Sequence, residues 1–121
     1  MKLEHYPVAK LKQQILEIAR KYLDVDRYHL FFFGSRINGQ GSERSDIDIG
    51  IEGTGPIEDK TFFALKEEIN KLPTLYKFDL VDFQKASDAF RQVALKNIED
   101  IHRPGMKRSP VQKRSATQKE K

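Results

Sequence analysis

An aromatic and apolar run occupies residues 28–33, with the sequence Tyr-His-Leu-Phe-Phe-Phe, and Gly34 and Ser35 end it. So short a run, continuously apolar and without alternation, is typical of a strand that is covered on both faces. Such a strand lies inside a sheet, because its two rows of side chains must both be shielded from water. The run therefore predicts a layered domain built on a small sheet.

Two further segments alternate between apolar and acidic residues, as strands with two different faces do. In residues 46–52 the isoleucines share one face, and Asp46 and Asp48 share the other. In residues 76–83 the same period places Asp79 on the face opposite a Phe and a Leu. We therefore expect strands at both positions, each with carboxylates on one face.

Three segments carry apolar residues at a spacing of three to four, which predicts helices that pack on the sheet. The first spans residues 7–23, the second ends before Pro73, and the last begins after Ser87 as N-cap. The predicted core-facing residues of the second and last helices are Phe62, Phe63, Leu65, Ile69, Leu72, Phe90, Val93, Ala94, Ile98 and Ile101. This order predicts an α/β (α+β) fold, a small mixed sheet of three to four strands flanked by helices.

Charge divides the chain into two parts. The whole chain of 121 residues has a formal charge of +4, but residues 103–121 hold seven basic residues and one acid, and residues 1–102 have a charge of −2. The length favours one domain with a modest core. We therefore expect a folded domain at 1–102 and a basic disordered tail at 103–121. The uneven charge disfavours a nucleic-acid-binding protein.

The chain contains no cysteine, which excludes a disulfide framework, a zinc–thiolate site and a thiol nucleophile. Any metal ion must therefore bind to oxygen or to histidine. The sequence has neither an apolar run of the length that a membrane span needs nor the pattern of a signal peptide. We expect a soluble, cytoplasmic protein.

The chemistry concentrates in a spaced motif: Gly34-Ser35, ten residues, and then Asp46-x-Asp48. Residues 34–45 have the composition of a loop with room for one helical turn. A Gly-Ser turn after a buried strand offers backbone N–H groups and a hydroxyl to a phosphate. Two carboxylates two residues apart on a strand have Cα atoms about 6.6 Å apart, which suits binding of a divalent cation.

Asp79 supplies a third carboxylate from another strand. If that strand lies beside the one with Asp46 and Asp48, all three carboxylates meet at one edge of the sheet. Three carboxylates and two Mg²⁺ ions are the usual apparatus for in-line attack on a phosphoryl group. Asp79 would then serve the attacking hydroxyl.

The Gly-Ser pair, the ten-residue spacer, the Asp-x-Asp motif and the later Asp79 resemble the DNA polymerase beta-like nucleotidyltransferase superfamily, and in particular its minimal nucleotidyltransferases. The resemblance covers about residues 8–102, which would be the nucleotidyltransferase domain. It implies that Gly34, Ser35 and Arg36 bind the triphosphate of ATP, and that Asp46, Asp48 and Asp79 are catalytic residues that bind Mg²⁺.

The same resemblance implies a partner. Minimal nucleotidyltransferases work with an all-helical HEPN protein encoded nearby, which is often a toxin. The resemblance therefore implies an antitoxin that transfers AMP from ATP to a tyrosine of the HEPN protein, with the two proteins forming a hetero-oligomer. The alternative is a non-catalytic nucleotide-binding module that neutralises or regulates the HEPN partner by binding.

Other interpretations of these residues are weaker. A phosphate-binding Walker loop needs Lys-Ser/Thr where the chain has Gln40-Gly41. Taken alone, Asp46 and Asp48 fit the solvated face of a strand. Asp82 lies at an odd offset from Asp79, which favours a surface or capping role. The three histidines are scattered and are not assigned to the site, and Arg44 is interpreted as a solvated loop residue.

Overall fold

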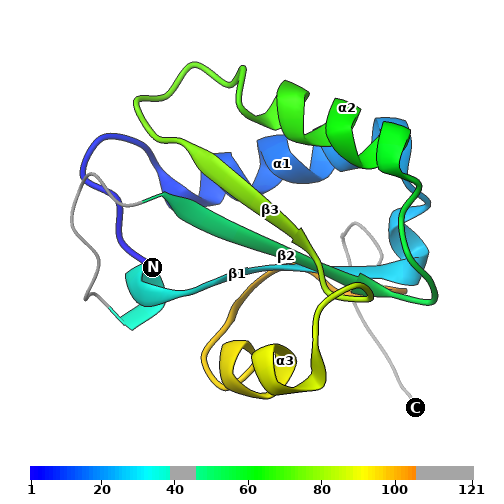
Figure 1. Ribbon diagram of the computed structural model, residues 1–121. Coiled ribbons are helices and arrows are strands. Elements are labelled where there is room, and N and C mark those ends of the chain that lie inside the picture. Colours follow the sequence, from blue (N-terminus) through cyan, green and yellow to red (C-terminus); the bar gives the residue numbers. More distant parts are fainter. Residues whose placement is uncertain (39–45, 106–121) are drawn as a thin grey trace, which may run out of the picture.

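A four-stranded mixed sheet forms the centre of the computed structural model, which describes residues 1–38 and 46–105 (Figure 1). The strands lie in the order β3-β2-β1-β4. Their bounds are β1 Tyr28–Phe33, β2 Ile47–Gly53, β3 Phe78–Asp82 and β4 Glu99–His102. β1 pairs antiparallel with both β2 and β4, whereas β2 and β3 run parallel. The predicted α/β class and the three predicted strands are confirmed.

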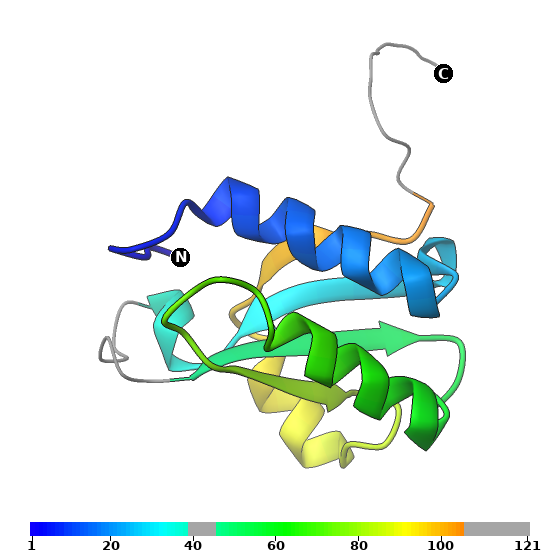
Figure 2. The same ribbon diagram turned by 90° about the horizontal axis from the view of Figure 1, so that it is seen from above.

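Helices cover both faces of this sheet. The helices α1 (Val8–Tyr22) and α2 (Asp59–Ile69) lie side by side on one face, and the short helix α3 (Asp88–Ala94) lies on the other (Figures 1 and 2). Two turns of 3₁₀ helix, η1 (Val25–Arg27) and η2 (Ser35–Asn38), flank β1. No helix in residues 1–38 and 46–105 is both long and apolar enough to cross a membrane.

The side chains of β1 divide between two cores, as the continuous apolar run predicts. Leu30 and Phe32 belong to the larger core under α1 and α2, which also buries the isoleucines of β2. Phe31 and Phe33 form a smaller aromatic core with Phe83 on the α3 side. The rings of Phe31 and Phe83 meet edge to face with centroids 5.0 Å apart, an arrangement that aromatic quadrupoles favour.

The prediction for the last helix is correct at its beginning and wrong at its end. The Ser87 hydroxyl accepts a hydrogen bond from the Phe90 N–H at 3.1 Å, which confirms the N-cap. The helix stops at Ala94, however, and Ile98 and Ile101 belong to β4 or directly precede it. β4 satisfies the backbone groups on the open side of β1, and this pairing outweighs the helical spacing of the apolar residues.

Phe63 was expected to face the core, and this prediction is wrong. Its side chain is 64% exposed, whereas Leu65 and Ile69 of the same helix are buried. Phe62, and not Phe63, packs against the core. Consecutive helical residues point in directions about 100° apart, so Phe62 and Phe63 cannot both face the sheet.

The structure leaves two sequence predictions untested. Most of the predicted tail lies outside the described residues, as do Gly39–Ser45 of the predicted loop and with them Arg44. The helical turn predicted within that loop is confirmed as η2. The division of the chain at residue 102 remains a prediction.

Candidate active site

The topology brings both halves of the sequence motif to one end of the sheet. Because β1 and β2 are antiparallel, the end of β1 lies beside the beginning of β2, and Phe33 pairs with Asp48. Because β2 and β3 are parallel, β3 begins at the same end, and Asp48 pairs with Asp79. The structure therefore places Gly34, Asp48 and Asp79 together, and exposed Asp46 directly precedes β2.

Gly34 joins the two halves through direct packing. Its φ angle is +90°, a conformation that residues with a side chain rarely adopt. A Cβ atom at this position would also overlap with the Oδ2 atom of Asp48. The absence of a side chain at residue 34 therefore leaves the space that the Asp48 carboxylate occupies.

The Asp48 carboxylate lies in an environment that disfavours its charge. Burial raises the pKa of Asp48, and the negative charges of Asp79 and Asp46 raise it further. A bound cation would reverse this effect, because it attracts all three carboxylates. Carboxylate oxygens are also the protein ligands that Mg²⁺ prefers. The donor set and its electrostatics therefore fit a magnesium ion.

The carboxylates do not form a complete cation site by themselves. In the described part of the chain, no three Asp, Glu, His or Cys side chains stand close enough together to hold a metal ion. Magnesium in such sites commonly keeps waters and takes further oxygens from substrate phosphates. A complete cation site therefore requires either that these side chains move closer together or that a bound ligand supplies further oxygen atoms.

Asp79 has a cationic neighbour that the sequence analysis missed. The Nζ atom of Lys66 in α2 lies 4.0 Å from the Oδ1 atom of Asp79, and both side chains are about half exposed. An ion pair of this length in water contributes little to stability. Nothing in the sequence spacing points to Lys66, because only the packing of α2 beside β3 brings it to the site.

The turn after Gly34 presents one polar side chain and buries another. Ser35 is exposed, and the Ile37 N–H donates to the Gly34 carbonyl at 3.1 Å, which closes the turn. Arg36 is only 7% exposed, and its guanidinium carbon lies 5.0 Å from the centroid of the Tyr76 ring. This stacking fixes η2 to the segment before β3. The predicted position of Arg36 close to a phosphate stays a prediction.

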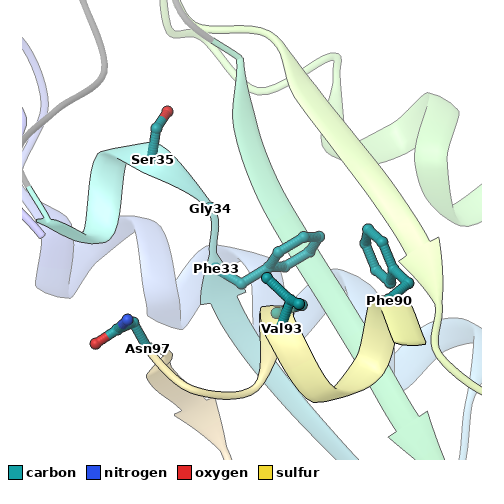
Figure 3. Close-up of a pocket in the computed structure, with 7 residues that line it drawn as sticks. Phe33, Gly34, Ser35, Phe90, Val93 and Asn97 are labelled. Atoms are coloured by element: carbon teal, nitrogen blue, oxygen red, sulfur yellow. The ribbon is translucent and has the colours of Figure 1, made fainter. Parts of the chain in front are cut away.

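A pocket of about 310 Å³ lies beside the Gly-Ser turn, between that turn and α3 (Figure 3). It is lined by Phe33, Gly34, Ser35, Phe90, Val93, Ala94 and Asn97. The spacing of apolar residues predicts Phe90 and Val93 in the core, but their side chains are 41% and 69% exposed. Their helical spacing marked a shared face correctly, but it could not show that this face lines an open pocket.

Asp82 binds backbone groups of two connecting segments and is not the N-cap of a helix, since Glu58 and Ser87 occupy those positions in α2 and α3. Its carboxylate accepts hydrogen bonds from the backbone N–H groups of Ile57, at 2.8 Å, and Gln84, at 3.0 Å. The side chain is 7% exposed, so the alternative prediction of an ordinary surface residue is wrong. Asp82 therefore holds the loop before α2 and the turn after β3.

Two comparisons concern the sequence. The family described as "Polymerase beta, Nucleotidyltransferase" matches residues 13–103. A relative from Haemophilus influenzae, named "Probable protein adenylyltransferase MntA", is 30% identical over 88 residues, which cover 71% of this chain and 77% of the relative. The residues matched by the family include the Gly-Ser turn and the strands β1, β2 and β3.

Solved structures share the fold. One is a tri-AMPylated Shewanella oneidensis HEPN toxin in complex with MNT antitoxin, with a TM-score of 0.60 and 18% identity over 77% of this chain and 70% of the other. Another is a toxin–antitoxin structure with AMP-PNP, with a TM-score of 0.64 and 21% identity over 75% of this chain and 72% of the other. At 18% and 21% identity, the similarity shows that this chain shares the fold of these structures.

Proposed function

Because this chain belongs to the polymerase beta nucleotidyltransferase family, we propose that it transfers AMP from ATP to a hydroxyl group in a Mg²⁺-dependent reaction. The observation that carries the proposal is the pairing of Asp48 with Asp79 beside a glycine that leaves room for the Asp48 carboxylate. Carboxylates that raise the pKa of a neighbour in this way favour a bound cation.

The motif residues divide into a group that holds magnesium and a group that binds phosphate. Asp46, Asp48 and Asp79 would hold magnesium, which, when bound, neutralises charge that develops on the reacting phosphates. The backbone after Gly34 and the Ser35 hydroxyl would bind the triphosphate, since glycine lets phosphate approach the chain closely. Asp79 is the more exposed of the paired carboxylates and would face the incoming hydroxyl.

The transfer exchanges one bond to phosphorus for another. The acceptor hydroxyl oxygen forms a bond to the α-phosphorus of ATP, and the bond between that phosphorus and the β-phosphate oxygen breaks. Pyrophosphate leaves, the hydroxyl proton is released, and AMP stays on the acceptor. The chain contributes the positions of the reacting groups and the charge that surrounds them.

We propose that the acceptor is a tyrosine of a HEPN protein and that the chain acts as its antitoxin in a hetero-oligomer. Two observations on other proteins support this step. The Haemophilus influenzae relative is named "Probable protein adenylyltransferase MntA". The similar Shewanella oneidensis structure contains an AMPylated HEPN toxin with MNT antitoxin. The domain at 1–102, the basic tail at 103–121 and a cytoplasmic location belong to the same proposal.

Label transfer from ATP tests this function. The full chain is incubated with ATP labelled in its α-phosphate, Mg²⁺ and the HEPN protein encoded beside it. We expect label on the HEPN protein, no label after EDTA is added, and no label with Asp48→Asn. An exposed aspartate outside the site supplies the matched control, Asp26→Asn, which should label the partner as the wild type does.

Two outcomes would contradict the proposal in different ways. Absence of label with every variant, in the presence of a folded partner, would exclude transfer to this protein. If toxicity of the partner is neutralised equally by the Asp46→Asn/Asp48→Asn double variant, the chain acts by binding alone. The second outcome would favour the non-catalytic alternative.

A further inference from the structure

The pocket between the Gly-Ser turn and α3 has no role in the transfer chemistry described above. We propose that it holds the base of the donor nucleotide, with the Phe90 side chain as its main contact. This inference rests on the proposed function, because it assumes that the triphosphate binds at Gly34 and Ser35. Both residues line the pocket, so a nucleotide bound there by its phosphates has the pocket within reach.

The chemistry of the lining suits an uncharged, planar group. None of the seven lining residues carries a charge, and apart from Gly34 and Ser35 at the edge of the pocket the lining offers phosphate no binding groups other than the Asn97 amide. Phe33, Phe90 and Val93 group together, whereas the Ser35 side chain points away from α3 (Figure 3). The polar and apolar sides of the turn are therefore separate. A nucleotide needs such a separation, because its phosphates bind to polar groups and its base binds to an apolar surface.

Exposed aromatic surface at this place is otherwise unexplained. The Phe33 and Phe90 rings are perpendicular with centroids 6.0 Å apart, and Phe90 also contacts the Phe83 ring at 5.6 Å. These contacts fix the Phe90 ring while 41% of it remains exposed. Aromatic side chains that are held in this way are suitable stacking surfaces for a base.

The size of the pocket fits part of a nucleotide. Its volume of about 310 Å³ is at the lower end of the range for small-molecule sites, about 300–1,000 Å³. Asn97 is the lining residue that offers an amide, which can donate and accept hydrogen bonds at the edge of a base. The triphosphate would remain outside, at the turn and the carboxylates.

Comparison of two ligands isolates the contribution of the base. ATP and inorganic tripolyphosphate are each titrated calorimetrically, with Mg²⁺, into the full chain. Both bind at the phosphate end, but only ATP carries a base. We expect ATP to bind at least about tenfold more tightly than tripolyphosphate, and we expect Phe90→Ala to weaken ATP binding about tenfold while tripolyphosphate binding stays unchanged.

Two further variants keep the test sharp. Val93→Trp should fill the pocket and weaken ATP binding in the same selective way, and its exposed position makes the substitution tolerable to the fold. Phe63→Ala is the matched control, because Phe63 is an exposed phenylalanine of α2 on the opposite face of the sheet. It should bind both ligands as the wild type does.

The outcomes separate this inference from the proposed function. If the wild type binds both ligands and the ratio of their affinities is unchanged in Phe90→Ala and Val93→Trp, the base lies elsewhere and the inference is wrong, although the proposed function stands. Loss of label transfer without loss of ATP affinity would assign the pocket to the acceptor and overturn the inference. If the wild type binds neither ligand, the nucleotide function and the inference fail together.

Discussion

Gly34 has no side chain, and this affects both the local backbone conformation and the space for the Asp48 carboxylate. Gly34→Ala would place a Cβ atom against the Asp48 carboxylate and would force an unfavourable φ angle. We expect the variant to lose about 1 kcal/mol or more of its free energy of unfolding and to lose Mg²⁺-dependent ATP binding. Urea unfolding and calorimetric titration measure the two effects.

Gly55 provides the matched control for this substitution. A Cβ atom at Gly55 would meet no other atom within 4 Å. Gly55→Ala should therefore bind ATP normally and change the free energy of unfolding by no more than about 0.5 kcal/mol. Equal ATP affinity in both alanine variants would show that the contact between Gly34 and Asp48 is irrelevant to the site.

Removal of the Asp48 charge should stabilise the folded protein and abolish the rise in its unfolding temperature that Mg²⁺ and ATP cause. The raised pKa of Asp48 indicates that folding brings its carboxylate into an unfavourable environment. At neutral pH in EDTA, we expect Asp48→Asn to unfold at a higher temperature than the wild type. Mg²⁺ and ATP should raise the unfolding temperature of the wild type, by mass action, and leave the variant unchanged.

Thermal unfolding of Asp26→Asn controls for the general loss of a negative charge. Asp26 is an exposed residue of η1, so this variant should respond to Mg²⁺ and ATP as the wild type does. A wild type that is more stable than Asp48→Asn in EDTA would contradict the account of charge repulsion at the carboxylates.

Sequence patterns predicted some site residues better than others. The period of two placed Asp46 and Asp48 on one face, because side-chain direction in a strand follows directly from position. The burial of Arg36 against Tyr76 and the approach of Lys66 to Asp79 were not predictable in the same way. Both depend on how a loop or a helix packs beside the sheet, which no local spacing encodes.

The strand β4 shows how an element can depend on its neighbour. The spacing of Ala94, Ile98 and Ile101 predicts that the last helix extends through these residues. In the fold, the open edge of β1 offers backbone donors and acceptors, and residues Glu99–His102 pair with it. Tertiary pairing decides the structure of such a short segment, and local propensity is a weak guide there.

A hydrogen-bonded carboxylate, Asp100, lies between β1 and β4 and should make stability depend on pH. Burial alone would raise the pKa of Asp100, but hydrogen bonds from His29 and Arg103 lower it overall. The Nε2 atom of His29 lies 2.6 Å from the Oδ1 atom of Asp100. A carboxyl group whose pKa is lowered by folding stabilises the folded state at pH values above its ordinary pKa of about 4. This stabilisation is lost as the pH falls through the pKa of the folded state.

Comparison with Asp100→Asn tests this dependence. At neutral pH the variant should be less stable than the wild type, and the difference should shrink as the pH is lowered from about 6 to about 3. Urea unfolding at several pH values provides the measurement. A difference that stays constant over this range would show that the Asp100 charge contributes nothing to the stability of the β1–β4 pair.

At the scale of the whole molecule, the layered fold follows from the pattern of apolar residues. The continuous run of β1 required cover on both faces, and the structure provides α1 and α2 on one side and α3 on the other (Figure 1). The sequence predicts three to four strands, and the fourth, β4, lies in residues that the helical spacing assigned to the last helix. The strand order could not be derived, because it depends on which edges remain free.

The topology also explains why one end of the sheet carries the site. The strands β2 and β3 begin there and β1 ends there, so the residues at these three strand ends lie close together. The fold therefore brings the motif residues to one place, although Asp79 lies 44 positions after Ser35 in the sequence. We propose that this end of the sheet is a magnesium and nucleotide site.

Calorimetric titration of ATP into the full chain tests that claim most directly. It is carried out with Mg²⁺, then with EDTA, and then with Mg²⁺ on Asp46→Asn. The account predicts binding by the wild type with Mg²⁺, and a large loss of affinity both in EDTA and in the variant. Binding of equal strength under all three conditions would contradict the assignment of the carboxylates to a magnesium–nucleotide site.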